Sequence, residues 1–317
     1  MNNKKLIGLV IGLLVIVAIS YGLLKTGVFS KKDSVNTPQE NQTKKLKVVV
    51  SFYPLADFAK NVGGDYVDVT NITPTGAEPH DYEPTPQDIA KVYNSDVFIA
   101  NGNGVDAWAD KIEEDLISKG IKVIKISGHV ASLKSNSPEG QASFDPHFWL
   151  DPVYVEEEID IIADTLIEID SVHEKEYNQN RNAYKAQLEE LEQEYTKGLA
   201  SCQIRQIVTS HNAFNYLANR YNLTTLYILG LSPDEEPSPK AIAEVANIAR
   251  QKGIKYIFFE TLVSPKLSET IANEIGAKTL VLNPIEGLTD EEIAQDKNYI
   301  SVMRDNLTNL KVALQCQ

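Results

Sequence analysis

A long helical stretch in the middle of the chain restricts most strongly how it can fold. From Glu174 to Leu199, apolar and aromatic residues recur at helical spacing, and neither Pro nor Gly interrupts them before Gly198. This stretch is longer than an ordinary helix of a globular domain. We therefore expect a rigid connector helix over residues 174–200 that joins two lobes. Its core-facing stripe should contain Tyr177, Tyr184, Leu188, Leu191 and Tyr195.

Short β-rich runs alternate with amphipathic helical runs on both sides of this connector. Such alternation is typical of α/β proteins with parallel sheets. We predict a first lobe over 47–173 and a second over 201–317, each with a mainly parallel sheet flanked by helices. The expected strands are 47–52, 68–73, 97–101, 123–126, 205–209, 224–229, 256–260 and 279–282. The expected helices outside the connector are 53–64, 86–93, 107–120, 153–169, 212–221, 239–252, 265–275 and 301–314.

The beginning of the chain predicts export from the cytoplasm. An apolar run from Leu6 to Leu24 contains no charge. It is long for a cleaved secretory signal and sufficient to span a bilayer. We expect residues 1–30 to form a membrane anchor, with a cleaved signal and a periplasmic or secreted protein as the alternative. No Cys follows the run, which argues against a lipid-modified cysteine, and the polar residues 31–46 are expected to form a flexible tether.

The charge balance limits the classes of partner. Beyond residue 32 the chain carries 25 Lys and Arg against 44 Asp and Glu. This negative balance argues against nucleic acid or anionic lipid as a partner. It suits a protein that collects cations, although solubility alone would also explain it.

Four residues with metal-binding side chains stand in constrained loops after predicted strands. The sequence Asp145–Pro152 (DPHFWLDP) shows the pattern best, because its two prolines stiffen the backbone and its aromatic residues would shield the imidazole of His147. Ligands of open α/β sheets bind where strands end, so a cleft between the lobes would let the four side chains converge. Three His and one carboxylate are a natural tetrahedral set for zinc, whereas each His taken alone would more simply be a buried structural residue. The four candidates are His80, His147, His211 and Glu286.

Other acids and histidines receive a different interpretation. Glu78 and Asp81 flank His80, and we expect them to support the site from outside its ligand set or to lie at the surface. Glu260 ends a predicted strand and should be a buried structural acid. His129 and His173 lack flanking Pro and aromatic residues, so we expect both to be exposed to solvent.

These segments carry a family resemblance that covers residues 47 to about 314. The chain resembles the zinc/manganese-type solute-binding proteins of metal ABC transporters (cluster A-I), in the zinc-uptake branch. The resemblance implies two α/β lobes joined by one long rigid helix, and a protein that binds and releases a metal ion without catalysing a reaction. The motifs that carry it are Gly76–Tyr82 (GAEPHDY), Asp145–Pro152 (DPHFWLDP), Ser210–Phe214 (SHNAF), Glu236–Ser238 (EPS) and Asn283–Leu288 (NPIEGL).

The resemblance implies metal ligands at His80, His147 and His211, and a His at the third position is common in zinc-preferring members. For the fourth ligand it offers two answers, since Asn283 matches an Asp of manganese-type members and Glu286 matches a Glu of some zinc-type members. We expect Glu286, because three neutral imidazoles leave the charge of Zn²⁺ uncompensated. Water completing the shell is the alternative. Asn283 offers only a neutral carbonyl, and its replacement by Ala is expected to change zinc binding little.

The predicted function is a high-affinity zinc receptor outside the cytoplasm that delivers Zn²⁺ to an ABC-type permease in the membrane. We expect a monomer without enzyme activity and without a nucleic-acid partner, and release by small movements because the connector limits hinge closure. One alternative is a manganese or iron receptor of the same family. The others are an adhesin or metal chaperone without its own permease, and an extracellular zinc hydrolase.

The only two cysteines, Cys202 and Cys316, are expected to form a disulfide, because disulfides persist in exported proteins. Two free buried thiols are the alternative. The chain also contains N-x-Thr sequons, which matter only in an organism that glycosylates proteins. They begin at Asn41, Asn71, Asn222 and Asn306.

Overall fold

The computed structural model describes residues 44–136, 142–234 and 236–317. The apolar run from Leu6 to Leu24 lies outside these residues, so the anchor and most of the tether remain predictions. Within the described ranges, no helix has both the length and the apolar character needed to cross a bilayer.

The first lobe is built on a parallel sheet of four strands in the order β2-β1-β3-β4. Successive strand residues face opposite sides of a sheet. Accordingly Val48 and Val50 of β1 belong to the main core, whereas Val49 packs into a second core on the other side. The strands are β1 (Leu46–Val50), β2 (Val67–Asn71), β3 (Val97–Ala100) and β4 (Lys122–Lys125).

Helices cover both faces of this sheet, as the predicted α/β class requires. Residues of two helices join the main core on one face, namely α2 (Tyr53–Gly63) and α6 (Pro152–Ile169). Residues of three shorter helices pack on the other face, namely α3 (Pro86–Tyr93), α4 (Ala107–Asp110) and α5 (Glu113–Ser118).

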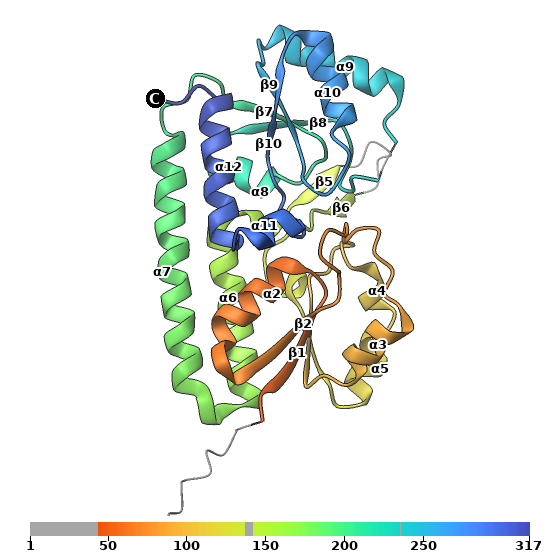
Figure 1. Ribbon diagram of the computed structural model, residues 1–317, viewed down its shortest axis with the longest axis vertical. Coiled ribbons are helices and arrows are strands. Elements are labelled where there is room, and N and C mark those ends of the chain that lie inside the picture. Colours follow the sequence, from red (N-terminus) through yellow and green to blue (C-terminus); the bar gives the residue numbers. More distant parts are fainter. Residues whose placement is uncertain (1–43, 137–141, 235) are drawn as a thin grey trace, which may run out of the picture. The chain divides into compact units, whose positions relative to one another are not determined.

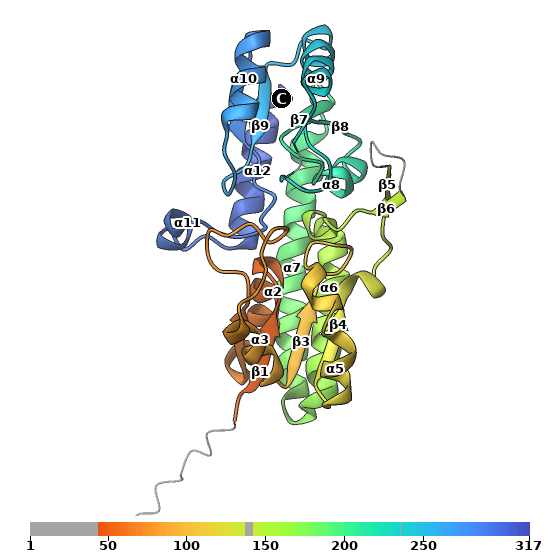
Figure 2. The same cartoon turned by 90° about the vertical axis from the view of Figure 1, so that its right-hand side faces the viewer.

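The long helix predicted in the middle of the chain is confirmed as α7 (Glu174–Leu199). Its 26 residues give a length of about 39 Å. It packs against α2 and α6 of the first lobe and against α12 (Tyr299–Ala313) of the second, and Figures 1 and 2 show it running alongside both lobes. All five residues of the predicted stripe are buried, together with Leu199.

The second lobe repeats the alternation of strands and helices. Hydrogen bonds join β7 to β8 and β9 to β10 in two parallel pairs, and β7 lies beside β9. The resulting spatial order β8-β7-β9-β10 matches the order in the first lobe. The strands are β7 (Gln206–Thr209), β8 (Thr224–Tyr227), β9 (Tyr256–Phe259) and β10 (Lys278–Val281). The helices besides α12 are α8 (Asn215–Arg220), α9 (Pro239–Gln251), α10 (Lys266–Ile275) and α11 (Asp290–Ala294).

Two sequence-based expectations about local structure were wrong. The helix predicted over 107–120 is divided into α4 and α5, because the N–H groups of Lys111 and Ile112 bond to carbonyls three residues earlier and tighten the chain between them. No strand was predicted between residue 126 and His147, but this segment contains a short antiparallel hairpin of β5 (Lys134–Asn136) and β6 (Ala142–Phe144).

The predicted disulfide between Cys202 and Cys316 is confirmed. It joins the chain just after α7 to the residues after α12. Backbone bonds support this junction, from Ile204 N–H to the Leu314 carbonyl and from Gln317 N–H to the Ser201 carbonyl. The C-terminal residues are therefore held against the start of the second lobe.

Candidate metal centre

The four candidate ligands meet in one cluster. His80, His147, His211 and Glu286 each offer one donor atom, and these atoms all lie within 4.8 Å of one another. His147 and His211 are fully buried, and the side chains of His80 and Glu286 are 6% and 0% exposed. The cluster is therefore shielded from water.

Four of the six distances between donor atoms in the cluster match those between ligands of a tetrahedral ion. Oε1 of Glu286 lies 3.4 Å from Nε2 of each of the three His. The Nε2 atoms of His147 and His211 are 3.2 Å apart. Donor atoms bound at zinc distances of 2.0–2.1 Å in a tetrahedron are separated by about 3.3–3.4 Å. A zinc ion therefore fits among these four atoms.

Each candidate ligand lies on a loop that follows a strand. His80 is on the loop between β2 and α3, and His211 comes two residues after β7. Glu286 is on the loop after β10. His147 follows β6 and precedes the 3₁₀ helix η3 (Phe148–Leu150). The first lobe thus supplies two side chains and the second lobe the other two.

Asp145 holds the imidazole of His147 in place. Its Oδ1 lies 2.8 Å from Nδ1 of His147 and also accepts the backbone N–H of His147 at 2.9 Å. Its other oxygen accepts a bond from the Asn215 side chain of α8 at 2.8 Å. With Nδ1 bonded in this way, the opposite nitrogen Nε2 faces the cluster. The acid that orients His147 is therefore itself held by the second lobe.

Glu260 performs the same task for His211. Its Oε1 lies 2.7 Å from Nδ1 of His211, and the backbone N–H of His211 donates to the same oxygen at 3.2 Å. The hydroxyl of Ser210 is a further donor. Glu260 is only 2% exposed, so the expectation of a buried acid is confirmed. Its bond to His211 was not predicted.

The charges in the cluster are strongly coupled. Burial lowers the pKa of His80. Burial acts in the same direction on His211, but the negative charges of Glu260 and Glu286 outweigh it and raise the pKa of His211 well above its usual value. Burial alone would raise the pKa of Glu286, yet the charge of His211 and the proximity of the three His side chains hold it well below the ordinary range. The site thus keeps Glu286 negatively charged.

Three buried donor or acceptor atoms in the cluster lack a hydrogen-bond partner among the described residues. They are Nε2 of His80 and both carboxylate oxygens of Glu286. Leaving such polar atoms unpaired in a protein interior costs free energy. A bound cation would satisfy these atoms directly, so the donor set suits a metal ion.

The remaining candidates lie outside the cluster. Glu78 accepts the backbone N–H of His80 at 3.3 Å, and burial together with the charge of Glu286 raises its pKa to about 10. Asp81 and His129 are exposed. The expectation for His173 was wrong, because its ring stacks on Tyr66 and its Nδ1 lies 2.6 Å from Asp170.

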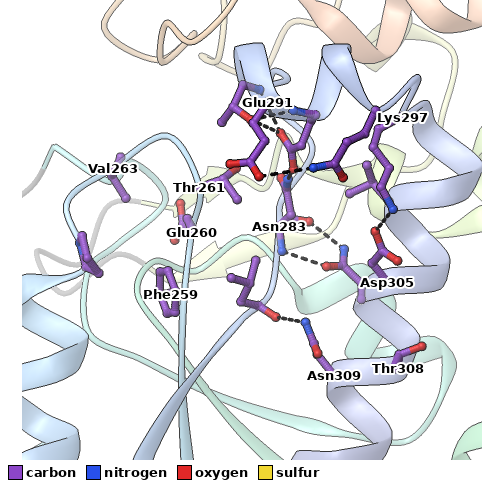
Figure 3. A pocket seen from close by; sticks show the side chains of 17 residues that line it. Phe259, Glu260, Thr261, Val263, Asn283, Glu291, Lys297, Asp305, Thr308 and Asn309 are labelled. Atoms are coloured by element: carbon purple, nitrogen blue, oxygen red, sulfur yellow. Dashed lines mark hydrogen bonds and ion pairs between the residues drawn. The ribbon is translucent and has the colours of Figure 1, made fainter.

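A pocket of about 600 Å³ lies beside the cluster in the second lobe (Figure 3). None of the four candidate ligands lines it, but Glu260 and Asn283 do. Glu292 and Asn306, which are hydrogen-bonded to Asn283, also belong to its wall. The pocket therefore borders the residues that support the cluster.

The sequence matches a known protein family over most of its length. Residues 48–313 match the family described as zinc-uptake complex component A, periplasmic (ZnuA). The chain is 36% identical over 313 residues to the high-affinity zinc uptake system protein ZnuA of Bacillus subtilis (strain 168), covering 96% of this chain and 97% of that protein. It is 38% identical over 284 residues to the zinc-binding lipoprotein AdcA of Streptococcus pneumoniae (strain R6), covering 86% of this chain and 56% of AdcA.

Solved structures show the same fold. The Zn(II)-bound ZnuA-like domain of Streptococcus pneumoniae AdcA aligns with a TM-score of 0.75 at 39% identity, covering 85% of this chain and 99% of that one. A mutant of the laminin-binding adhesin Lmb of Streptococcus agalactiae aligns with a TM-score of 0.78 at 35% identity, again covering 85% and 99%.

Proposed function

Because the chain belongs to the ZnuA family of zinc-uptake proteins, we propose that it is the zinc receptor of an uptake system and that His80, His147, His211 and Glu286 hold the ion. The family consists of solute-binding receptors and not of enzymes. The observation that carries the proposal is the convergence of the four donor atoms within 4.8 Å in a buried cluster. The ion is the cargo, and the proposed cycle is binding and release without a chemical step.

The donor set favours zinc over manganese. Imidazole nitrogen suits Zn²⁺, whereas Mn²⁺ is better matched by carboxylate, carbonyl and water oxygens and prefers six ligands. Three His and one carboxylate at tetrahedral spacing therefore support zinc as the preferred ion. Glu286 supplies one negative charge, and Asp145 and Glu260 place two more carboxylates against the imidazoles. This charge compensates Zn²⁺ in a buried place.

Contacts across the lobes support release by small movements. The indole N–H of Trp149 in the first lobe donates to the carbonyl of Pro284 in the second at 2.8 Å. The hydroxyl of Tyr299 on α12 donates to the carbonyl of Trp149 at 2.7 Å. Together with α7 packed on both lobes, these bonds oppose a wide hinge opening. Loop movements at the cluster are the proposed route for the ion.

The test is the metal content of protein purified without chelators, followed by competition between zinc and manganese. We expect one zinc per chain and displacement of manganese by zinc. Preferential retention of manganese would favour the manganese-receptor alternative. Esterase, phosphatase and peptidase assays on the zinc-loaded protein address the hydrolase alternative, which requires an activity that disappears in the His147→Ala variant.

The setting of the receptor is also a proposal. We propose that residues 1–30 anchor the chain to the membrane and that residues 31–46 form a tether. The rest of the chain is proposed to be a monomer, with lobes over 47–173 and 201–317 joined by the connector over 174–200. This monomer passes zinc to an ABC-type permease. The family description as a periplasmic uptake component supports a place outside the cytoplasm. Cell fractionation tests the anchor. A soluble product with a new N-terminus between about residues 20 and 40 would show a cleaved signal instead.

A further inference from the structure

We propose that Asn283 is a positioning residue that folds the loop after β10 so that Glu286 points at the three imidazoles. The inference rests on the proposed function, in which Glu286 is a zinc ligand. It replaces the sequence-based expectation that Asn283 contributes little. The claim is that the amide of Asn283 acts through Glu286 and does not bind the ion itself.

Every polar group of Asn283 is already bonded within the protein. Its side-chain oxygen accepts the backbone N–H of Ile285 at 2.7 Å, and its side-chain nitrogen donates to Oε1 of Glu292 at 2.8 Å. Its backbone N–H and carbonyl both bond to the Asn306 side chain, at 2.8 and 2.7 Å. Figure 3 shows Asn283 among the hydrogen-bonded side chains of the pocket wall. Because Asn283 is only 3% exposed, these bonds are screened from water.

The loop needs such a clamp because Ile285 has an unfavourable backbone conformation. Its φ is +59°, in the left-handed region that β-branched residues seldom adopt. Conformations of this kind cost about 1–3 kcal/mol and persist only where the surroundings enforce them. Here the Ile285 side chain is fully buried in the main core and its N–H is held by Asn283. This turn places the next residue, Glu286, inside the cluster.

Glu292, which accepts the hydrogen bond from the side-chain amide of Asn283, is also held in place. Glu292 uses Oε2 to accept the backbone N–H and the hydroxyl of Thr289, at 2.8 and 3.1 Å, in the capping box of α11. Its Oε1 accepts from Asn283. The side chain of residue 283 must therefore accept from Ile285 and donate to Glu292. Asn meets both requirements, whereas an ionised Asp of the same shape would have no hydrogen to donate and would face the carboxylate of Glu292.

An exchange of the two functional groups tests this assignment. Asn283→Asp removes the N–H group that donates to Glu292. Glu292→Gln leaves only one side-chain oxygen at position 292, where two carboxylate oxygens accept bonds from Asn283 and Thr289. The double variant Asn283→Asp/Glu292→Gln restores both bonds, because the carboxamide at position 292 can then donate to the carboxylate at position 283 while its oxygen accepts from Thr289. Zinc affinity of the full chain would be measured by chelator competition, and the coordination by the visible spectrum of the Co²⁺-loaded protein. Asn283→Ala serves as a second single variant. A protonated Asp at position 283 could still donate a hydrogen bond to Glu292, whereas Ala cannot.

We expect Asn283→Asp and Asn283→Ala to weaken zinc binding by about 10- to 100-fold, as is typical for residues that orient metal ligands. Their Co²⁺ spectra should lose the intensity of a four-coordinate site, which a general loss of stability would not cause in the folded, loaded protein. The double variant should return to within about threefold of wild type, because contacting residues couple in such cycles. Asn309→Ala is the matched control. It removes a hydrogen bond from the side-chain amide of Asn309 to the Val281 carbonyl in the same pocket wall. This change should leave zinc binding unchanged.

The outcomes separate this inference from the proposed function. If Glu286→Gln binds zinc like wild type, the ligand set itself is wrong. If Glu286→Gln binds weakly while both Asn283 single variants bind like wild type, only the positioning role is overturned. A double variant that is folded but as weak as Asn283→Asp, or that does not fold, would also overturn it, because the exchange keeps both hydrogen bonds.

Discussion

Oε1 of Glu260 lies 2.7 Å from Nδ1 of His211, although 49 residues separate them in the sequence. Asp145 and His147 form the same relationship at 2.8 Å. In both cases a buried carboxylate fixes the imidazole and leaves Nε2 facing Glu286. Such partners orient metal ligands and raise their basicity. The affinity of the site should therefore depend on acids that do not touch the ion.

We predict that Glu260→Gln and Asp145→Asn each weaken zinc binding by about 10- to 100-fold. Each change removes the charge that stabilises the oriented imidazole while keeping the size of the side chain. Zinc titration against a competing chelator measures the effect. Glu83→Gln is the control, because the Glu83 side chain is 76% exposed and lies in the Pro-rich segment that carries His80. Wild-type affinity in both buried variants would show that the two acids serve only the fold.

Replacing a candidate ligand should lower zinc affinity more than replacing one of these supporting acids. We predict that His80→Ala, His147→Ala and His211→Ala each weaken zinc binding by more than about 100-fold, since each removes one of four donor atoms. Glu286→Gln should also weaken it strongly by removing the negative donor. His129→Ala is the control for loss of a histidine, because His129 is exposed. If Glu286→Gln binds like wild type, the charge comes from another acid, and Glu78 beside His80 is the next to replace.

The meeting of the four side chains was predictable because it depends on topology. His211 and Glu286 each follow a strand, and parallel strands end at a common edge. The connector was equally predictable, since its stripe from Tyr177 to Tyr195 repeats with the helical period through most of a 26-residue helix. Long, strongly periodic segments and strand ends are the features that a single sequence specifies best.

The supporting bonds could not be predicted in the same way. Glu260 meets His211 because β9 lies beside β7, and strand order is not visible in local patterns. Asn283 depends on Glu292 and Asn306, which are 9 and 23 residues away. The hairpin of β5 and β6 was missed because its strands have only three residues each. Periodicity needs longer segments than these.

The disulfide should contribute to stability and not to zinc binding. We predict that Cys202→Ser/Cys316→Ser lowers the free energy of unfolding by about 2–5 kcal/mol, because the bridge closes a long loop in the unfolded chain. The bridge spans 114 residues and joins the ends of α7 and α12, which carry none of the candidate ligands. Denaturant unfolding measures the loss, and zinc titration should be unchanged. Two reactive thiols in unfolded, unreduced wild-type protein would contradict the bridge.

Because of Glu158 on α6, we predict that the free energy of unfolding falls as pH rises. It is fully buried, and neither carboxylate oxygen has a hydrogen-bond partner among the described residues. Burial raises its pKa well above the usual value. The folded state therefore binds a proton that the unfolded state releases above the ordinary Glu pKa of about 4.3, so stability is lost as pH rises from there.

Glu158→Gln removes this titration. We expect the variant to gain about 1 kcal/mol or more over wild type at pH 8, and the gain to shrink as pH falls toward 5. Unfolding by denaturant at several pH values measures the difference. Glu189→Gln, at an exposed position on the neighbouring helix α7, is the control and should show no such trend. A pH-independent difference between Glu158→Gln and wild type would contradict the assignment.

X-ray absorption spectroscopy of the zinc-loaded full chain tests the central claim most directly. The account predicts one zinc per chain with four ligands at about 2.0–2.1 Å, three of them imidazoles and one a carboxylate oxygen. Glu286→Gln should change the oxygen contribution and keep the three imidazoles. A shell of five or six mainly oxygen ligands, or one with fewer than three imidazoles, would contradict the account.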